Sequence, residues 1–251
     1  MRLALGIEYD GGAYNGWQRQ RVGRGVQEVL EDCARQVADH DVEIVCAGRT
    51  DTGVHASGQV GHFDTDSERS ERGWVLGINS ALPDDISVRW VRPVSDDFHA
   101  RFSATGRRYR YRILNRLVRS ALERDRCWWI YQPLDADAMH RAGQQLLGEH
   151  DFSAFRAAAC QANTANRELT TLTVGRDGDW ITLEVAGNAF LQHMVRNITG
   201  TLVAVGSGQQ PETWVADVLA SRDRKQGGIT APPQGLTLTQ VNYPQAFALP
   251  G

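Results

Sequence analysis

Residues Gly25–Cys46 read GVQEVLEDCARQVADHDVEIVC and contain both a helical and a strand pattern. The first part predicts an amphipathic helix over 25–39, because apolar side chains recur there with i, i+3, i+4, i+7 spacing. These side chains are Val26, Val29, Leu30, Cys33 and Val37. The last part, from Val42 to Cys46, predicts a short strand. The flanking sequence then decides what kind of sheet this helix and strand belong to.

The sequence on either side of this stretch supplies the rest of one sheet. Residues 3–9 alternate well enough for a strand, and 59–63 and 86–91 also predict strands. Between the last two, residues 74–82 show a helical pattern that ends before Pro83. The order β-α-β-β-α-β is typical of the ferredoxin-like fold, in which a four-stranded antiparallel sheet carries two helices on one face.

The second half of the chain has the same α+β style without repeating the sequence. Asp135 is a suitable N-cap for a helix that Gly148 ends, and Pro211 suits the start of a later helix. A longer helix is predicted at 189–205, and the strands at 107–114, 168–174, 180–185 and 236–241. We therefore expect an α+β protein of two ferredoxin-like or RRM-like halves, residues 1–104 and 105–251, with the boundary near 103–106.

The composition is that of a globular protein. Of the 251 residues, 41% are hydrophobic and 23% charged, which argues against disorder. No apolar run reaches the roughly 18 residues that a membrane helix needs, and the N-terminal strand reaches Glu8 too early for a signal peptide. We expect a soluble, cytoplasmic protein. The four cysteines, Cys33, Cys46, Cys127 and Cys160, form no C-x-x-C pair, so we expect buried small side chains rather than a zinc or redox motif.

Basic residues are unevenly distributed along the chain. The net charge is −3, and Lys225 is the only lysine among the 27 basic residues. Between Arg101 and Arg126 there are nine arginines and two acids, a local charge of +7 that leaves −10 for the remainder. Such a stripe suits phosphate binding by an otherwise acidic protein. The alternative is that these arginines cover the solvated face of a strand, and composition does not decide between the two.

The segment Ala47-Gly48-Arg49-Thr50-Asp51-Thr52-Gly53-Val54-His55 is the strongest candidate for chemistry. It places an arginine, a carboxylate and hydroxyls on a glycine-bracketed loop between two strands, a common way to display catalytic groups. An arginine two residues from Asp51 favours the ionised carboxylate. The structural alternative is an Asx-turn, in which Asp51 bonds its own backbone and Gly53 has a positive φ.

Two other chemistries fit these residues less well. Asp51-Thr52-Gly53 is the aspartic-protease triplet, but that mechanism needs two such carboxylates and the chain holds one copy. A metal site from His55, His62 and Asp64 lacks the ligand spacing of known motifs. We expect no metal.

With these residues in view, the chain resembles the tRNA pseudouridine synthase I family over essentially its whole length. Residues 47–55 match the catalytic motif of that family, which usually has Ala where this chain has Thr52. Four further groups of matches lie in family order: Tyr9-Asp10-Gly11 with Gly16-Trp17-Gln18-Arg19-Gln20; Asp97–Ala104; Arg108-Tyr109-Arg110-Tyr111; and, near the end, Phe190-Leu191 with His193–Ile198 and Ala231-Pro232 with Gly235-Leu236.

The resemblance implies isomerisation of uridine to pseudouridine at positions 38 to 40 of the tRNA anticodon stem-loop. It also implies no cofactor, and a homodimer in which both subunits contact one tRNA. The implied fold is a central antiparallel sheet flanked by helices, with the active-site cleft between the two halves.

The same resemblance gives roles to individual residues. Asp51 is expected to be the essential carboxylate, and Arg49 to assist base flipping and contact RNA. Arg196 matches the basic position of the family, and we expect it to pair with Asp51; the alternative is a surface cation. Tyr109 is expected to stack on the target uracil, with core packing as the alternative. Leu236 matches a position near the reactive base, although an ordinary core leucine fits equally well.

Strand periodicity places Tyr109, Tyr111 and Ile113 on one face and Arg108, Arg110 and Arg112 on the other, so Tyr111 is expected in the core. On the helix predicted at 189–205, we expect His193, Arg196 and Asn197 to form one polar stripe.

Further residues match RNA contacts of the family: Arg69 and Arg101, the segment Phe98, His99, Ala100, Arg101 and Phe102, and the segment Ala159, Cys160, Gln161, Ala162 and Asn163. The local charge adds Arg107, Arg116 and Arg119. A second class of function remains, a catalytically silent protein that binds tRNA with the same basic cleft. Retention of Asp51, Arg49, Tyr109 and Arg196 together argues against it. Thr52 is the departure from the family pattern, and we expect its side chain to point away from the base.

Overall fold

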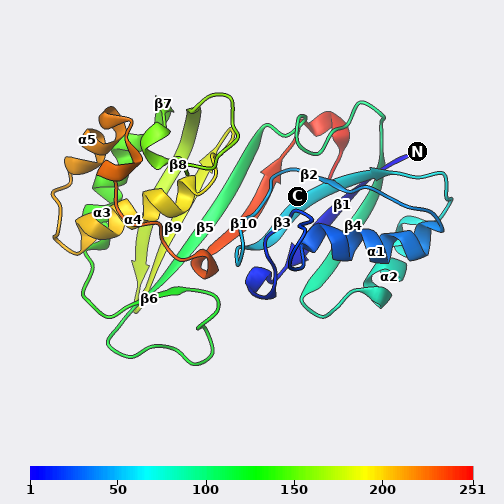
Figure 1. Ribbon diagram of the computed structural model, residues 1–251, viewed down its shortest axis with the longest axis horizontal. Helices are drawn as coiled ribbons and strands as arrows, with labels where there is room; N and C mark the ends of the chain where they lie inside the picture. The colour runs from blue at the N-terminus through cyan, green and yellow to red at the C-terminus, as the bar shows by residue number, and fades with distance from the viewer. Residues whose placement is uncertain (251) are drawn as a thin grey trace. The chain divides into compact units, whose positions relative to one another are not determined.

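The computed structural model describes residues 1–250, which form two compact units (Figure 1). The first unit comprises Met1–Gly106 together with the segment that begins at Leu238, and the second comprises Arg107–Thr237. The predicted division at 104/105 differs from this arrangement, because it assigns the C-terminal segment to the second half. That segment packs with the first unit instead.

The first unit has the predicted element order. It contains β1 (Arg2–Tyr9), α1 (Val26–Ala38), β2 (Val45–Cys46), β3 (His55–Asp64), α2 (Glu71–Ala81) and β4 (Ile86–Val94). Strand β1 pairs antiparallel with both β3 and β4, and β2 pairs antiparallel with β3. The predicted β-α-β-β-α-β unit with an antiparallel sheet is confirmed.

Both faces of this sheet are covered. Leu3, Leu5 and Ile7 of β1 are buried, and Trp74 of α2 packs edge-on against Phe63 of β3, with ring centroids 5.5 Å apart. The other face carries a cluster of Ala4, Ala47, Val60, Phe98 and Ala100. The C-terminal segment covers this cluster with Val241, Tyr243, Phe247 and Leu249. Burial on two faces explains why β1 is almost continuously apolar rather than strictly alternating.

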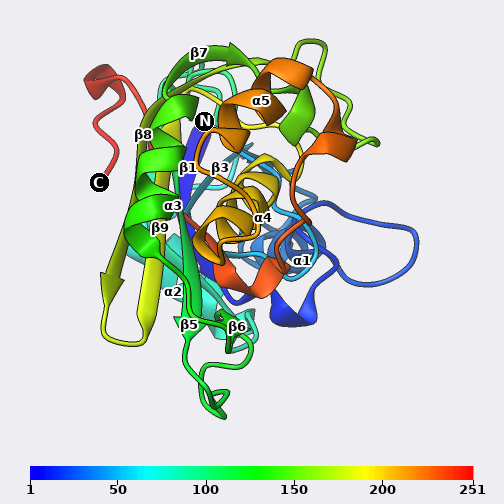
Figure 2. The same cartoon turned by 90° about the vertical axis from the view of Figure 1, so that its left-hand side faces the viewer.

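The second unit is also built mainly on antiparallel strands. Its elements are β5 (Gly106–Asn115), β6 (Trp128–Ile130), α3 (Ala136–Gly143), β7 (Gly148–Asp151), β8 (Asn166–Asp177), β9 (Trp180–Gly187), α4 (Met194–Gly206) and α5 (Trp214–Ser221). Strand β9 pairs with β5 and β8, β8 pairs with β7, and short β6 runs parallel to β5. Helix α3 packs on β8 and on α4, its neighbour in Figure 2. The last strand, β10, spans Leu236–Asn242.

The mixed α+β fold class is thus confirmed, and the main differences concern element ends. The helix predicted at 189–205 begins at Met194, so its first turn is wrong. The reason is His193, which has a left-handed backbone with φ of +62° and cannot continue a right-handed helix. Asp135 caps α3 as predicted, its side chain accepting from Ala138 N. Strands β6 and β7, of three and four residues, were not predicted.

Among residues 1–250, no helix is both long and apolar enough to cross a bilayer.

Candidate active site

The loop between β2 and β3 carries Asp51, and backbone hydrogen bonds hold it at several points. Ala47 N donates to Val60 O over 2.8 Å at its start, and Trp17 N donates to Thr50 O over 3.0 Å in its middle. Gly53 N donates to Tyr14 O. The matched segment around Gly16-Trp17 therefore serves as a brace for the Asp51 loop.

The loop ends in a tight turn that exposes the residue next to the carboxylate. Val54 N donates to Asp51 O over 3.1 Å, and Gly53, at the third position of this turn, has a φ of +77°. This positive φ is what the Asx-turn alternative expects for Gly53, and it is a conformation that favours glycine. Asp51 is half-buried, whereas Arg49 and Thr52 are exposed. The β-branched Thr52 therefore sits in the exposed position of the turn.

Buried polar side chains support the loop from below. The Thr50 hydroxyl shares a 2.8 Å hydrogen bond with the Tyr9 hydroxyl, and Gln59 Nε2 donates to Gly48 O over 2.6 Å. Gln59 is completely buried, and Tyr9 and Thr50 nearly so. Sequence patterns assign no role to Gln59, because within an alternating strand it looks like any polar residue. Its full burial marks it as part of the frame for Asp51, since buried polar groups require partners.

Replacing Gly16 by Ala is expected to destabilise this frame. Gly16 has a φ of +91°, and a Cβ there would lie 2.6 Å from Thr50 O. Left-handed strain and the clash together cost about 2–4 kcal/mol. Urea unfolding measures the loss. Gly175→Ala is the control, because nothing lies within 4 Å of its Cβ position; equal stability of the two variants would contradict the bracing role.

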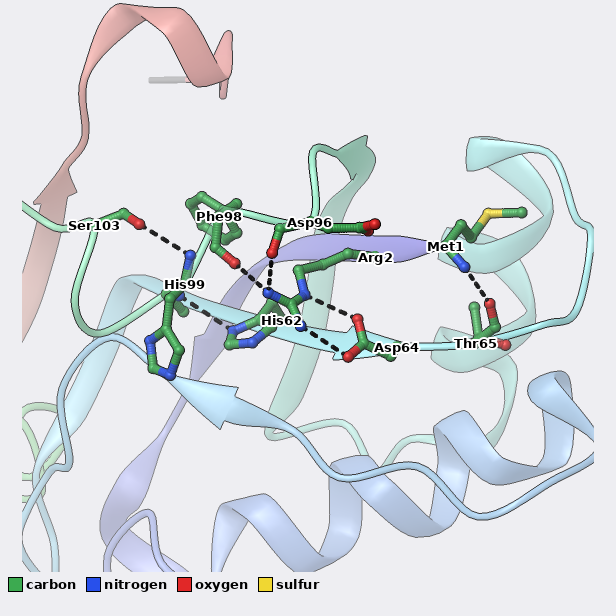
Figure 3. Close-up of polar contacts among 10 residues, drawn as sticks. Met1, Arg2, His62, Asp64, Thr65, Asp96, Phe98, His99 and Ser103 are labelled. Atoms are coloured by element: carbon green, nitrogen blue, oxygen red, sulfur yellow. Dashed lines mark hydrogen bonds and ion pairs between the residues drawn. The ribbon is translucent and has the colours of Figure 1, made fainter.

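The candidate RNA-contact segment 98–102 follows β4 and is held by hydrogen bonds from Arg2 and to His62 (Figure 3). Arg2 forms a bidentate ion pair with Asp64, both contacts at 2.8 Å, and donates to the carbonyls of Asp96 and Phe98. His62 Nδ1 accepts from Ala100 N over 3.1 Å. Phe98 and Ala100 are fully buried, so their side chains belong to the core. The exposed side chains here are those of Arg101 and Phe102.

These exposed side chains form a stacked group. Arg101 Cζ lies 5.6 Å from the centroid of the Phe102 ring, and the His99 and Phe102 rings are 4.3 Å apart. His99 Nδ1 accepts from the backbone N of both Arg101 and Phe102. A guanidinium beside an open aromatic ring is an arrangement on which nucleobases stack.

The burial of His62 predicts a pH dependence of stability. Burial, together with the nearby Arg2 and His99, lowers the pKa of His62 from 6.5 to about 4. His62 of the unfolded chain therefore takes up a proton near pH 6.5, whereas His62 of the folded chain takes it up only near pH 4. Stability from this group is complete above pH 6.5 and is lost as the pH falls toward 4, by about 2 kcal/mol between pH 7 and 5.

Urea unfolding of the wild type and of His62→Asn at pH 7 and 5 measures this term. An asparagine carbonyl still accepts from Ala100 N but does not titrate. The wild type is expected to lose about 2 kcal/mol more than the variant over this range. Equal losses would show that His62 does not titrate between folded and unfolded states.

The second unit carries Tyr109 on β5. Tyr109, Tyr111 and Ile113 are all buried, as periodicity predicted. Tyr111 is a core residue: it is fully buried and its hydroxyl donates to Pro232 O over 2.7 Å. Burial raises its pKa well above the ordinary value. Tyr109 retains 8% exposure and meets Phe190 edge-on, with centroids 4.9 Å apart.

Arg196 lies in the first turn of α4 and is tied to the segment before β10. Its Nε donates to Ala231 O over 2.7 Å, and Ala231 N donates to Arg196 O over 3.1 Å. A Cβ on Gly200, one turn further along, would lie 1.8 Å from Ile229 O, so this segment lies directly against the helix. Leu236 follows it as a buried residue at the start of β10.

The predicted polar stripe of His193, Arg196 and Asn197 is wrong. His193 precedes the helix in a left-handed conformation. Asn197 is buried, and its Nδ2 donates to Phe155 O over 2.8 Å. Only Arg196 of the three remains a half-buried residue within the helix.

The remaining RNA-contact candidates lie in loops. Arg69 is exposed just before α2. The segment 159–163 is a loop whose backbone is held by Arg156, which donates to the carbonyls of Cys160 and Ala162. Three of the cysteines are buried as predicted, but Cys160 is half-exposed because it lies in this loop.

The arginine stripe is partly neutralised. Several of its members pair with carboxylates: Arg110 with Glu184, Arg112 with Glu123, Arg116 with Asp179, and Arg124 with Asp125. Arg107 is nearly buried and donates to Asn188 O. Arg110 and Arg112 fit the strand-face alternative, since both lie on β5 beside a carboxylate, whereas Arg101, Arg116 and Arg119 are exposed.

The candidate metal ligands are engaged otherwise: His55 Nδ1 accepts from Gly11 N, and Asp64 binds Arg2. Within residues 1–250, no three His, Cys, Asp or Glu side chains come together in a way that would hold a metal ion.

Comparison with known proteins assigns the chain to a family. The sequence model described as tRNA pseudouridine synthase matches residues 6–103 and 142–244. A protein of Aeromonas hydrophila named tRNA pseudouridine synthase A is 58% identical over 250 residues, which cover 100% of this chain and 93% of that one. Proteins of the same name from Pseudoalteromonas atlantica and Escherichia fergusonii are 56% and 52% identical, covering 100% and 99% of this chain and 95% and 92% of theirs. This chain therefore belongs to the tRNA pseudouridine synthase family, a family of isomerases.

Proposed function

We propose that this enzyme converts uridine to pseudouridine at positions 38 to 40 of the tRNA anticodon stem-loop, with Asp51 as the essential carboxylate. The observation that carries the proposal is the Asp51 loop itself. Residues 14–17 hold its backbone by hydrogen bonds. The buried Tyr9 and Gln59 bind the Thr50 hydroxyl and the Gly48 carbonyl. A rigid frame of this kind holds a reactive group in one geometry.

The reaction is balanced without an oxidant or reductant. The N1–C1′ bond of uridine breaks, the uracil turns, and a C5–C1′ bond forms. The hydrogen on C5 leaves as a proton, and N1 takes up a proton. Asp51 acts in its ionised form, whether as a nucleophile toward the ring or C1′ or as a base. Arg49, exposed two residues before it, helps to hold the flipped nucleotide, which costs a few kcal/mol to extrude.

Tyr109 and Arg196 are the other two side chains that we propose to act on the uridine. Tyr109 is held edge-on by Phe190, which suits a ring that packs on one side and offers its face or hydroxyl to a base. Arg196 is oriented by its Nε bond to Ala231 O, and we infer that its charge acts on Asp51 or on the developing negative charge. Leu236 contributes apolar surface beside the base.

Affinity for tRNA comes from exposed arginines and loops rather than from base-specific contacts. Arg101 with Phe102, Arg69, and the 159–163 loop are the proposed contacts, joined by Arg116 and Arg119. Phosphate contacts of this kind tolerate different sequences, which fits an enzyme that modifies neighbouring positions. We further propose a cytoplasmic homodimer in which both subunits contact one tRNA.

The proposal is tested with three tRNAs that each hold a single uridine at 38, 39 or 40, and a fourth with none there. Mapping pseudouridine after incubation with enzyme is expected to find one new pseudouridine in each of the first three and none in the fourth. Conversion elsewhere in the tRNA would overturn the positional assignment. Salt-dependent binding of all four without conversion would favour the catalytically silent tRNA-binding protein.

A further inference from the structure

A cationic concavity of about 520 Å³ lies in the second unit, at the beginning of α4. Three stretches that are distant in the sequence build it: 157–159, 192–197 and 224–230. Arg224 and Lys225 line it, and none of the lining residues is an Asp or Glu. Asp51, Tyr109, Arg196 and Leu236 are not among them.

Arg224 brings a charge that its hydrogen-bond partners do not neutralise. Its Nη2 donates to Asn197 Oδ1 over 3.0 Å and to Thr230 Oγ1 over 3.1 Å. Both acceptors are uncharged, and partial burial lowers the pKa of Arg224, although an arginine remains protonated at neutral pH. A half-buried guanidinium held by neutral oxygens is stabilised when an anion approaches it.

The side chains that hold the Arg224 guanidinium are themselves fixed by hydrogen bonds. Asn197 is 1% exposed, and its Nδ2 donates to Phe155 O. Its Oδ1 also accepts from the Thr230 hydroxyl over 2.7 Å. Arg224 is thus positioned by a buried network, which fixes where its remaining N–H groups point.

Two further features add positive potential. Lys225, the only lysine of the chain, is exposed at the concavity. Its backbone N donates to the carboxylate of Asp223, which fixes the turn. Helix α4 begins at the concavity, and its first turn holds no acidic residue and no side-chain cap. The positive end of a helix favours phosphate oxygens.

From these observations we propose that the concavity binds a phosphate group of the tRNA backbone, with Arg224 and Lys225 as its ligands. The proposal rests on the proposed function only in taking tRNA as the molecule that carries the phosphate. The site contributes to affinity and to the orientation of the RNA, not to bond breaking. A free phosphate ion has the same chemistry as a backbone phosphate, and the experiment distinguishes these two possible ligands.

The experiment measures the dissociation constant of tRNA against salt concentration for the wild type, Lys225→Gln and Arg222→Gln. Arg222 is the matched control: it is exposed, lies three residues before Lys225, and pairs with Asp151 at 3.3 Å outside the concavity. Both variants remove one positive charge, so any general effect of net charge is common to both. Lys225→Gln is expected to weaken binding about 3- to 10-fold and to reduce the slope of log affinity against log salt by about 0.7–0.9. Arg222→Gln is expected to leave the slope unchanged.

Arg224→Gln and inorganic phosphate complete the test. Arg224→Gln is expected to lower the slope as Lys225→Gln does, and its thermal unfolding shows whether it folds. Stabilisation of the wild type by millimolar phosphate, with tRNA affinity unaffected by Lys225→Gln, would overturn the RNA assignment in favour of a free anion. Equal salt slopes for the wild type, Lys225→Gln and Arg222→Gln, without stabilisation by phosphate, would overturn the site altogether. The turnover number at saturating tRNA, measured in parallel, is expected to stay at the wild-type value in Arg222→Gln. If the wild type formed no pseudouridine in the same assay, the proposed function would be contradicted instead.

Discussion

Asp51→Asn is expected to reduce pseudouridine formation by a factor of at least about 1,000, while tRNA affinity stays within about 3-fold of the wild type. The change removes the charge that any nucleophilic or basic role requires, and it keeps the size of the side chain. The turn survives, because Val54 N binds the backbone carbonyl of residue 51 rather than its side chain. Single-turnover conversion of tRNA and filter binding give the two quantities separately.

Thr52→Ala is the matched control for this loop. Thr52 is exposed, and alanine removes only its hydroxyl and its methyl group. Activity is expected to remain within about 2-fold, and stability within about 0.5 kcal/mol, as for other exposed substitutions. If Asp51→Asn retained a tenth of wild-type activity, or if Thr52→Ala lost as much as Asp51→Asn, the carboxylate would not be the essential group.

Arg196→Met is expected to lower the turnover number about 100- to 1,000-fold, the size of effect seen when one electrostatic donor is removed from an active site. Arg196→Lys is expected to recover part of this loss, because it restores the charge but not the planar Nε–H that binds Ala231 O. Arg141→Met is the control. Arg141 is an exposed arginine of the same unit, paired with Glu212 at 2.6 Å, and its loss is expected to leave turnover unchanged.

A double variant tests whether Asp51 and Arg196 serve one uridine. If Asp51 and Arg196 act on the same bond-breaking step, Asp51→Asn combined with Arg196→Met is expected to be no slower than Asp51→Asn alone. Multiplication of the two defects would show that the residues act independently. Unfolding curves for each single variant separate this result from a loss of the hydrogen bond to Ala231.

Sequence patterns predicted the elements whose order depends on local periodicity. The helix around Leu30 and the buried face of Tyr109, Tyr111 and Ile113 follow from spacings of 3.6 and 2 residues, and the structure confirms both. The start of α4 could not be found this way. Phe190 and Leu191 continue the apolar pattern, but the left-handed backbone of His193 interrupts the helix.

Long-range packing explains what else was missed. The C-terminal segment covers the second face of the first sheet through Tyr243 and Phe247 on Phe98, and nothing local in residues 238–250 indicates that partner. Gln59 supports the Asp51 loop from a neighbouring strand, a relation that only the sheet creates. The Asp51 loop was found because its residues are contiguous, whereas the Arg224 concavity was not, because three separate stretches build it.

The arginine stripe shows the same limit for charge. Counting residues gave +7 between Arg101 and Arg126, but it could not show that carboxylates such as Glu184 and Asp179 lie beside the strand. Arg110, for example, lies against Glu184 on the neighbouring strand. Charge patterns along a chain therefore indicate a partner only after the opposing charges from other strands are known.

The most direct test of the central claim is the release of tritium from tRNA that carries uridine labelled at C5. Formation of the C5–C1′ bond expels that hydrogen, so release reports the chemistry itself and not binding. The wild type is expected to release one tritium for each pseudouridine formed, and Asp51→Asn none above background at matched tRNA occupancy. Release by Asp51→Asn at the wild-type rate would contradict the role of Asp51, and binding without release by the wild type would contradict the proposed reaction.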